Sequence, residues 1–415
     1  MVNFEQERKS EDIKANESLS RLTKIDSPEF ETLLSIIARD AKERRDTKSE
    51  RGPYKAMKLI RETRLGAILL PSKLGGIGAS IQDLFYVVIR LAEADPDVAH
   101  ILRSHYRRVE QLIREGAGEE ENKALLKKVA NGAIFGSAFT EISTHNVGRL
   151  VFETTILNEN GDYRLNGKKY FTTGTLYSDL VNVTASGSDG KVISATIPTN
   201  REGVIIEDDW DGIGQRFTGS GTTRFQNVLV HKEEITTVRE NKTPFNSFAQ
   251  LYLHAIIAGI LRSVETDASI LVKNRKRTFS FAAAEVPKED PQLLQIIGEI
   301  SSIVFTAESL VLKAAEAVQN ASKSAIDGVI DYDLSHQASL LASQVKVIID
   351  SLALRASTLL FDVGGASATK QSAQLDRHWR NIRTLASHNP TVYKARAIGD
   401  YIVNGNPLPL KEVYF

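Results

Sequence analysis

The spacing of apolar residues changes twice along this 415-residue chain, and that change limits its fold more than any single motif. Apolar residues recur at helical spacing from about Ser27 to Asn131, alternate in short runs from Gly132 to Glu240, and return to helical spacing beyond Pro244. The pattern predicts an α+β, mostly α fold. We expect an N-terminal helical domain (1–131), a middle β-barrel or sandwich domain (132–240) and a C-terminal four-helix bundle (241–415).

Several elements have recognisable ends. Asp290-Pro291 is a capping residue followed by proline, which predicts the start of a long helix, and a second helix from about Leu334 should stop at Gly364-Gly365. Asn158 to Asp162 reads as a hairpin loop. The strands are expected in five runs: Val151–Leu157, Tyr163–Phe171, Leu180–Thr184, Lys191–Ile197 and Thr222–Val230.

Composition excludes several classes of protein. Lys plus Arg equals Asp plus Glu at 52 each, so we expect neither nucleic acid nor an anionic membrane as partner. Met1 to Asn16 lacks the pattern of a secretion signal, and no apolar run approaches the roughly 20 residues that span a bilayer, which predicts a soluble cytoplasmic protein. The chain has no cysteine, which excludes disulfides, thiolate metal sites and a cysteine nucleophile.

Familiar catalytic motifs are missing. The sequence contains neither G-x-x-x-x-G-K-[ST] nor G-x-G-x-x-G, so ATP or a nicotinamide dinucleotide should not bind in those ways. His100 and His105 are five residues apart and point in different directions on a helix, which argues against a metal site. The absence of G-x-S-x-G argues against a serine hydrolase.

The run from Asp376 to Pro390 concentrates arginines, two histidines and Trp379 within an apolar half of the chain. Burying such a set costs desolvation unless polar or anionic groups use it. Either a ligand site or a basic helix face with Trp379 as an apolar anchor would account for the run.

Short motifs in a fixed order carry a family resemblance. They are Leu70-Pro71-x-x-Leu74-Gly75-Gly76-x-Gly78, Ala138-Phe139-Thr140-Glu141, Asn166 to Gly174 and Gly364-Gly365. With the helix, β, helix order, this set resembles the acyl-CoA dehydrogenase superfamily. Dehydrogenases with this C-terminal alignment carry a glutamate base where this chain has Ala386 and Ser387, and neither residue can take a proton at neutral pH.

A second set of residues is similar to the flavin-dependent monooxygenase branch, which includes dibenzothiophene monooxygenase and sulfur-acquisition oxidoreductases. The set is Ala99-His100 with His105, Asp208-Asp209-Trp210, Ile213-Gly214-x-Arg216, Gly219 to Thr223, Asp376-Arg377-x-Trp379-Arg380-Asn381 and His388-x-Pro390. The resemblance implies a two-component monooxygenase in which a separate reductase supplies reduced FMN. Oxygen would form a flavin C4a-hydroperoxide that oxygenates a small organic substrate, such as an organosulfur compound. It also implies a homotetramer arranged as a dimer of dimers.

The resemblance assigns roles to particular residues. Catalysis would use His100, His388 and Thr173, with Thr173 near flavin N5 and imidazoles that titrate near neutrality. Trp210, His105 and Leu385 would line the substrate pocket. The flavin would contact Ser104, Ser137, Ala138, Phe139, Thr140, Glu141, Ile142, Lys169, Tyr170, Phe171, Thr172, Thr173, His388, Ala366 and Ser367, with Arg277 on its phosphate.

Three questions stay open at this point. An acyl-CoA dehydrogenase with a displaced base would bind FAD instead, and a non-catalytic scaffold would keep the fold without flavin. Arg103, Arg107 and Arg108 either face solvent or favour an anionic sulfur or carboxylate substrate. His105 competes with His100 for the position that faces the flavin.

Overall fold

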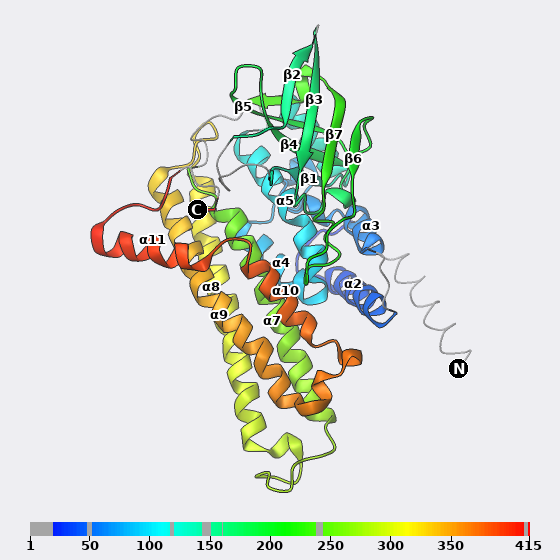
Figure 1. The fold of residues 1–415 in the computed structure, drawn as a ribbon, viewed down its shortest axis with the longest axis vertical. Coiled ribbons are helices and arrows are strands. Elements are labelled where there is room, and N and C mark those ends of the chain that lie inside the picture. The colour runs from blue at the N-terminus through cyan, green and yellow to red at the C-terminus, as the bar shows by residue number, and fades with distance from the viewer. Residues whose placement is uncertain are drawn as a thin grey trace, which may run out of the picture.

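The computed structural model describes residues 20–47, 52–116, 120–142, 151–159, 161–237, 244–410 and 414–415. The strands gather at one end of the molecule, long helices form the other end, and the N-terminal helices lie beside both (Figure 1). The predicted fold class, mostly helical with a sheet between two helical regions, is confirmed. The region examined for a secretion signal lies outside the described residues.

The N-terminal region is helical, as its periodicity predicts. Its helices are α2 (Pro28–Asp46), α3 (Tyr54–Thr63), α4 (Ile81–Ala94), α5 (Pro96–Arg114) and α6 (Glu120–Ala130). The Asp95 side chain caps α5 by accepting hydrogen bonds from the backbone N–H groups of Asp97 (2.9 Å) and Val98 (3.3 Å). Arg44 forms an ion pair with the same carboxylate. This cap determines where α5 begins and therefore which of its faces carries His100.

The middle region is a mixed sheet in the order β6-β7-β3-β2-β4-β5-β8, with β1 pairing in parallel with β4. The strands are β1 (Phe135–Ala138), β2 (Thr155–Glu159), β3 (Asp162–Lys169), β4 (Leu180–Ser186), β5 (Val192–Pro198), β6 (Val204–Ile206), β7 (Thr223–Val230) and β8 (Ile235–Thr237). The five predicted strands correspond to β2, β3, β4, β5 and β7. The sequence did not predict β1, β6 and β8 because three or four residues are too few to establish alternation.

Long helices form the C-terminal region: α7 (Ser247–Asn274), α8 (Pro291–Lys323), α9 (Tyr332–Gly364), α10 (Asp376–Ala386) and α11 (Thr391–Asn404). Asp290 caps α8 as predicted by accepting from the N–H of Gln292 at 2.9 Å. Gly365 follows the last residue of α9, and its φ of 58° is a backbone conformation that favours glycine. Helix α4 packs against α7 and α8, so the two helical regions share one hydrophobic core.

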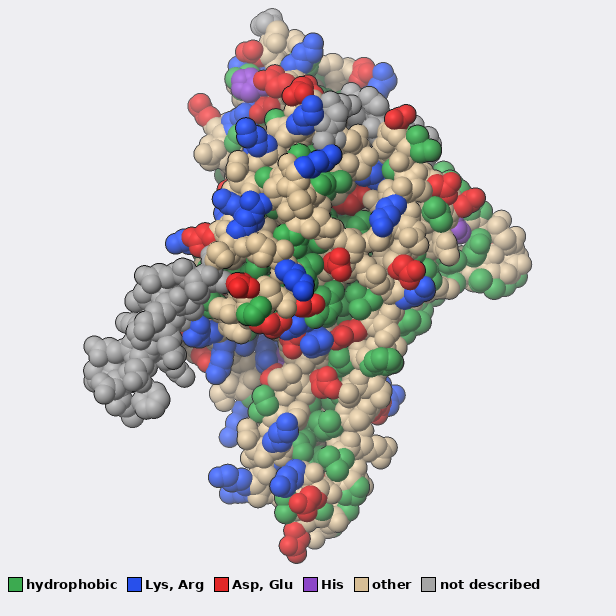
Figure 2. All heavy atoms as spheres, turned by 180° about the vertical axis from the view of Figure 1, so that it is seen from behind, with side chains coloured by type: hydrophobic (Ala, Val, Ile, Leu, Met, Phe, Trp, Pro, Cys, Tyr) green, Lys and Arg blue, Asp and Glu red, His purple; other side chains and the backbone are tan. Residues whose placement is uncertain are grey.

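Some apolar surface on the long helices remains uncovered. Leu294, which the periodicity places on the packed stripe of α8, is 49% exposed, and Phe305 is 75% exposed. By length and composition α8 could cross a membrane, and 28% of its most apolar window is buried. Apolar side chains also gather on the projecting helix α11 on the face seen in Figure 2. One side of the bundle is therefore apolar and open.

Candidate active site

His100 lies on α5 and contacts the loop between β6 and β7. Its Nδ1 is 3.0 Å from Oε1 of Gln215. An amide oxygen can only accept a hydrogen bond, so Nδ1 carries the proton and Nε2 is an unprotonated acceptor. Gln215 therefore fixes the tautomer of His100.

A chain of hydroxyl groups connects the Gln215 backbone to Thr173. The Thr218 hydroxyl donates to the carbonyl of Gln215 (2.8 Å), Ser220 Oγ lies 2.6 Å from Thr218 Oγ1, and Thr173 Oγ1 lies 2.8 Å from Ser220 Oγ. Because the Thr218 hydroxyl already donates its proton to the carbonyl, it can only accept from the Ser220 hydroxyl. The Ser220 hydroxyl in turn accepts from the Thr173 hydroxyl. The free lone pair of Thr173 is consequently an acceptor for a ligand. Two residues predicted to be catalytic, Thr173 and His100, thus belong to one hydrogen-bond network.

Gln215 is held in a conformation that glutamine rarely adopts. Its φ is 52°, and its N–H donates to Asn381 Oδ1 at 2.7 Å while its carbonyl accepts from Trp210 Nε1 at 2.9 Å. Its Nε2 is buried and has no hydrogen-bond partner within the part of the chain that the structure describes. A strained residue fixed by several contacts, with a spare donor, is typical of a ligand site.

Helix α10 supports this loop, which accounts for much of the basic run. Arg380 donates to the carbonyl of Ile213 at 3.0 Å, and a Cβ at Gly214 would lie 2.2 Å from the Arg380 carbonyl oxygen. Arg377 and His378 both contact Asp267 on α7, at 2.5 and 2.8 Å. These side chains of the run therefore clamp α10 to its neighbours, while His388 beyond α10 remains a candidate ligand group.

His388 follows α10 in a turn that two buried groups hold. Lys346 Nζ donates to the carbonyl of Ala386 at 2.9 Å, and Asn389 Nδ2 donates to Gln250 Oε1 at 2.8 Å. The imidazole is exposed and lies edge-on to the Tyr414 ring, with centroids 5.8 Å apart. Desolvation by neighbouring protein atoms and then the charge of Arg103 lower the pKa of His388 well below its usual value although the residue is exposed, and His100 contributes to the same shift. The charge of Arg103 therefore affects the pKa of both histidines.

Neither histidine titrates near neutrality, contrary to the expectation from its ordinary pKa. Burial, followed by the charge of Arg103, lowers the pKa of His100 to about 3. Both imidazoles are consequently neutral at pH 7 in the protein as described. They act as hydrogen-bond partners with a fixed tautomer rather than as a store of positive charge.

Phe171 offers an open aromatic surface beside Thr173. It is 55% exposed, has a φ of 54° and meets Trp210 edge-on with centroids 6.1 Å apart. A bulky side chain with positive φ is an outlier that persists only where its surroundings require it. Ile142, four residues after the end of β1, is also exposed. Flat, open apolar groups next to a hydroxyl acceptor suit a flavin ring.

Other predicted flavin residues have structural contacts. The ion pair between Lys169 Nζ and Glu141 Oε1 spans 2.7 Å with the two side chains 0% and 2% exposed, and Glu141 also accepts from the N–H groups of Glu153 and Thr154. Thr172 donates to the carbonyl of Gly221 at 3.0 Å. The remaining members lie on β1 or just beyond the ends of β1 and β3. Ala138 is buried and Ser137 is half-buried on β1, Phe139 packs edge-on to Phe152, and Tyr170 N–H donates to the Thr140 carbonyl.

His105 faces the core rather than the site. It is 0% exposed, its Nε2 lies 2.8 Å from the carbonyl of Gly66, and its Nδ1 accepts from the N–H of Phe135 at 3.1 Å. Both ring nitrogens are thus used by the backbone, and nothing is left for a substrate. Leu385 is likewise buried in the core, while Ser104 is half-buried beside Arg103 on α5.

Arg277, Ala366 and Ser367 lie at the far end of the bundle. Arg277 follows the last residue of α7, and Ala366 and Ser367 follow the end of α9, where Arg275 bonds the Val363 carbonyl at 3.1 Å. All three predicted residues are exposed. Helix α7 has 28 residues and starts beside the site, so these side chains are roughly 40 Å from it at about 1.5 Å per residue. One flavin cannot contact both groups within a single chain.

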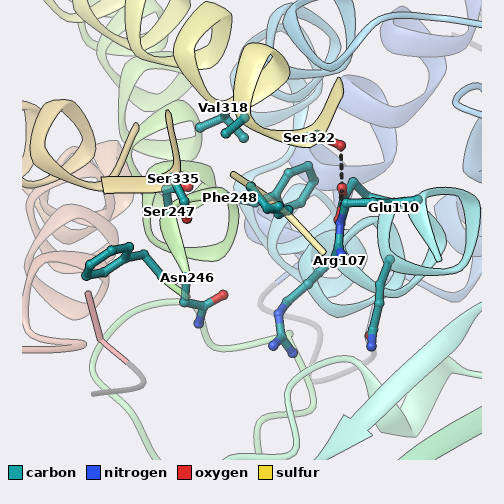
Figure 3. A pocket seen from close by; sticks show the side chains of 13 residues that line it. Arg107, Glu110, Asn246, Ser247, Phe248, Val318, Ser322 and Ser335 are labelled. Carbon is teal, nitrogen blue, oxygen red and sulfur yellow. Dashed lines mark hydrogen bonds and ion pairs between the residues drawn. The ribbon is translucent and has the colours of Figure 1, made fainter. Parts of the chain in front are cut away.

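A cavity of about 70 Å³ lies one helical turn beyond Arg103 and contains none of the predicted flavin residues. Arg107 of α5 and Asn246, Ser247 and Phe248 at the start of α7 line it, together with residues of α8 and α9 (Figure 3). Its small volume excludes a flavin.

Acid should destabilise the fold through its buried histidines. Burial lowers the pKa of His105 and of His378 to about 4, and that of His100 to about 3. Below pH 6.5 the unfolded chain binds protons that the folded chain does not, so the free energy of unfolding falls as the pH falls from 6.5 towards 4. Each histidine contributes about 1.4 kcal/mol per pH unit. Urea unfolding at pH 7 and pH 5 measures this, and a midpoint unchanged at pH 5 would contradict it.

Comparison with known proteins identifies the fold and its branch. Residues 251–392 match the acyl-CoA dehydrogenase C-terminal domain and residues 136–228 match the acyl-CoA dehydrogenase middle domain. Dibenzothiophene monooxygenase of Rhodococcus erythropolis is 31% identical over 368 residues, which cover 84% of this chain and 87% of that protein. The chain belongs to the flavin-dependent monooxygenase branch of the acyl-CoA dehydrogenase superfamily.

Two solved structures match over nearly the whole chain. FMN-bound TdsC from Paenibacillus sp. A11-2 has a TM-score of 0.83 and 25% identity, covering 92% of this chain and 100% of its own. Methanesulfinate monooxygenase MsuC from Pseudomonas fluorescens has a TM-score of 0.83 and 26% identity, covering 94% and 100%.

Proposed function

We propose that this protein is a two-component monooxygenase that uses reduced FMN and O2 to oxygenate a small organosulfur compound. The observation that carries the proposal is the hydrogen-bond network from Thr173 through Ser220, Thr218 and Gln215 to His100, which borders the exposed ring of Phe171. Reduced FMN supplies the electrons that activate oxygen. Since the chain lacks a nicotinamide fingerprint, a separate reductase would supply the reduced flavin in the cytoplasm.

The residues of the site fit a flavin. Phe171 and Trp210 would border the ring system, and the Thr173 lone pair would accept a hydrogen bond from the ring N5–H. The spare Nε2 donor of Gln215 suits a carbonyl or oxygen-derived acceptor. His100 Nε2 would accept a hydrogen bond from a group close to the reacting atoms.

Replacing Ser220 with alanine should uncouple oxygen use from product formation. Thr173 would lose its acceptor, and its hydroxyl would be free to rotate and donate towards the flavin. A neutral hydrogen bond contributes roughly 1 kcal/mol, so we expect about a five-fold rise in hydrogen peroxide per product. Ser194→Ala is the matched control, because Ser194 is buried on β5 and its hydroxyl donates to the Thr236 carbonyl, away from the Thr173 network. Equal peroxide yields from Ser220→Ala and Ser194→Ala would show that Ser220 does not orient the Thr173 hydroxyl.

A second copy of the chain would complete the cofactor site. Arg277, Ala366 and Ser367 are exposed and roughly 40 Å from the Thr173 network, so they would contact the flavin of a neighbouring subunit. The open apolar side chains offer the contact surface: Leu294 and Phe305 on α8, Ile348 on α9, and Val392, Tyr393, Ile402 and Val403 on α11. The proposed assembly is a homotetramer, a dimer of dimers. In analytical ultracentrifugation the Phe305→Glu variant should sediment with a smaller mass than the wild-type assembly.

Oxygen-18 labelling tests the proposed activity. The protein is mixed with a flavin reductase, NADH, FMN, ¹⁸O2 and, in separate reactions, dibenzothiophene or methanesulfinate. The proposal predicts that one compound gains a single labelled oxygen and that this requires the protein. If neither compound gains label and all oxygen becomes hydrogen peroxide at the rate of the reductase alone, the proposed function is wrong.

A further inference from the structure

Arg103 is a cation that no acid within the described ranges neutralises. It lies three residues after His100 on α5, so both side chains project from the same face of the helix. Its Nε donates to the backbone carbonyl of Ala249 at 2.9 Å, which fixes the guanidinium plane. Among the described residues no carboxylate pairs with it, and its two Nη groups form no hydrogen bond.

The surroundings of Arg103 add positive charge rather than remove it. Burial and then the charge of Arg107 lower the pKa of Arg103 to about 10, so it stays protonated at neutral pH. Arg107, one turn further along α5, lines the cavity shown in Figure 3. Glu110 is already bound to Arg114 at 3.0 Å and accepts from Ser322 at 2.6 Å. The face of α5 from His100 to Arg107 is therefore cationic.

A half-buried cation without a charged partner is unfavourable, and an anionic ligand reduces the cost. Arg103 lies one turn after His100 on α5, and its charge lowers the pKa of both His100 and His388. A guanidinium binds a planar or pyramidal oxyanion through paired donors better than a point charge does. A neutral fused thiophene gives these donors nothing to bind.

We propose that Arg103 binds the oxyanion group of the substrate, which is therefore a small organosulfur anion such as an alkanesulfinate. This rests on the proposed function and narrows its substrate class. In the reaction the sulfinate sulfur gains one S–O bond and the O–O bond of dioxygen breaks. The second oxygen atom leaves as water, and reduced FMN supplies two electrons and two protons. The products are a sulfonate and oxidised FMN.

Two isosteric compounds test the charge requirement. Methanesulfinate and dimethyl sulfoxide differ by an oxyanion in place of a methyl group, and each has a sulfur that can take one oxygen. In the wild-type enzyme, kcat/KM should be higher for methanesulfinate. Arg103→Met should lower kcat/KM for methanesulfinate roughly 10- to 100-fold, as expected for losing a charge-assisted bond, and change that for dimethyl sulfoxide less than about three-fold. Arg103→Lys should lower kcat/KM for methanesulfinate less than Arg103→Met does.

Calorimetry gives a readout that does not depend on turnover. Methanesulfonate, the unreactive product anion, should bind wild-type protein saturated with FMN and bind Arg103→Met at least about ten-fold more weakly. Arg108→Met is the matched control, since Arg108 is buried on α5 and bonds Gln111 at 3.1 Å. It should bind methanesulfonate as wild type does.

The outcomes separate the possible anions. If Arg103→Met weakens FMN itself but not riboflavin, the flavin phosphate is the anion and the substrate proposal is wrong. Equal losses for methanesulfinate and dimethyl sulfoxide, or no methanesulfonate binding by wild type, would also overturn it. If wild type binds the anion but fails to transfer labelled oxygen to any compound, the proposed function fails while the anion site stands.

Discussion

Replacing His100 with alanine should lower the rate of product formation about 10²- to 10³-fold, the usual loss on removing a preorganised hydrogen-bond partner of the transition state. The imidazole is neutral, and Gln215 leaves its Nε2 free to accept a hydrogen bond next to the reacting atoms. Binding of FMN should change by less than a few-fold, because His100 contacts Gln215 rather than the open Phe171 surface. Single-turnover rates with reduced FMN and methanesulfinate measure the loss.

His105→Gln is the control on the same helix. His105 uses both ring nitrogens on the backbone groups of Gly66 and Phe135, so its replacement should alter stability but leave the rate per folded molecule within about three-fold. On the proposed function His388→Ala should resemble His100→Ala, and the two losses should not add, because His100 contributes to the lowered pKa of His388. If His100→Ala and His388→Ala both keep wild-type rates, the assigned site is wrong.

Replacing Lys169 with methionine should lower the free energy of unfolding by about 3–5 kcal/mol. The change would leave Glu141 buried without its cation, although two backbone N–H groups still donate to the carboxylate. The double variant Glu141→Gln, Lys169→Met removes both charges. Its free energy of unfolding should fall less than that of Lys169→Met alone. Urea unfolding of wild type and the variants measures the differences.

The exposed ion pair of Lys191 and Asp189 provides the comparison. These side chains are 76% and 57% exposed, so Lys191→Met should cost less than about 1 kcal/mol. A loss for Lys169→Met no larger than that for Lys191→Met would mean that the buried pair does not hold β3 to the loop after β1.

Much of the fold can be read from the sequence because periodicity and caps are local. Asp290 precedes the first residue of α8 and Gly365 follows the last residue of α9, as their residue types predict. A carboxylate caps backbone N–H groups, and glycine accepts positive φ. The short strand β6 could not be read, because it depends on pairing with β7, nearly twenty residues further along the chain, rather than on its own pattern.

The site was less accessible to sequence reasoning. His100, His388 and Thr173 stand out through motifs, but the contact of Gln215 with His100 joins positions 115 apart in the chain. Ser220 lies within a quoted motif, yet only the structure gives its place between Thr173 and Thr218. The lowered pKa of His100 arises from burial and from Arg103, and neither is visible in a spacing pattern. That Arg103 has no carboxylate partner among the residues that the structure describes likewise cannot be seen in the sequence.

Anaerobic titration with reduced FMN, followed by rapid mixing with oxygenated buffer, tests the central claim most directly. The account predicts saturable binding of reduced FMN. It further predicts that reoxidation in the protein passes through a transient absorbing species that differs from both reduced and oxidised flavin and lasts longer in wild type than in Ser220→Ala. If reduced FMN does not bind, or reoxidises with the same time course as free flavin, the network from Thr173 to His100 does not shelter a flavin.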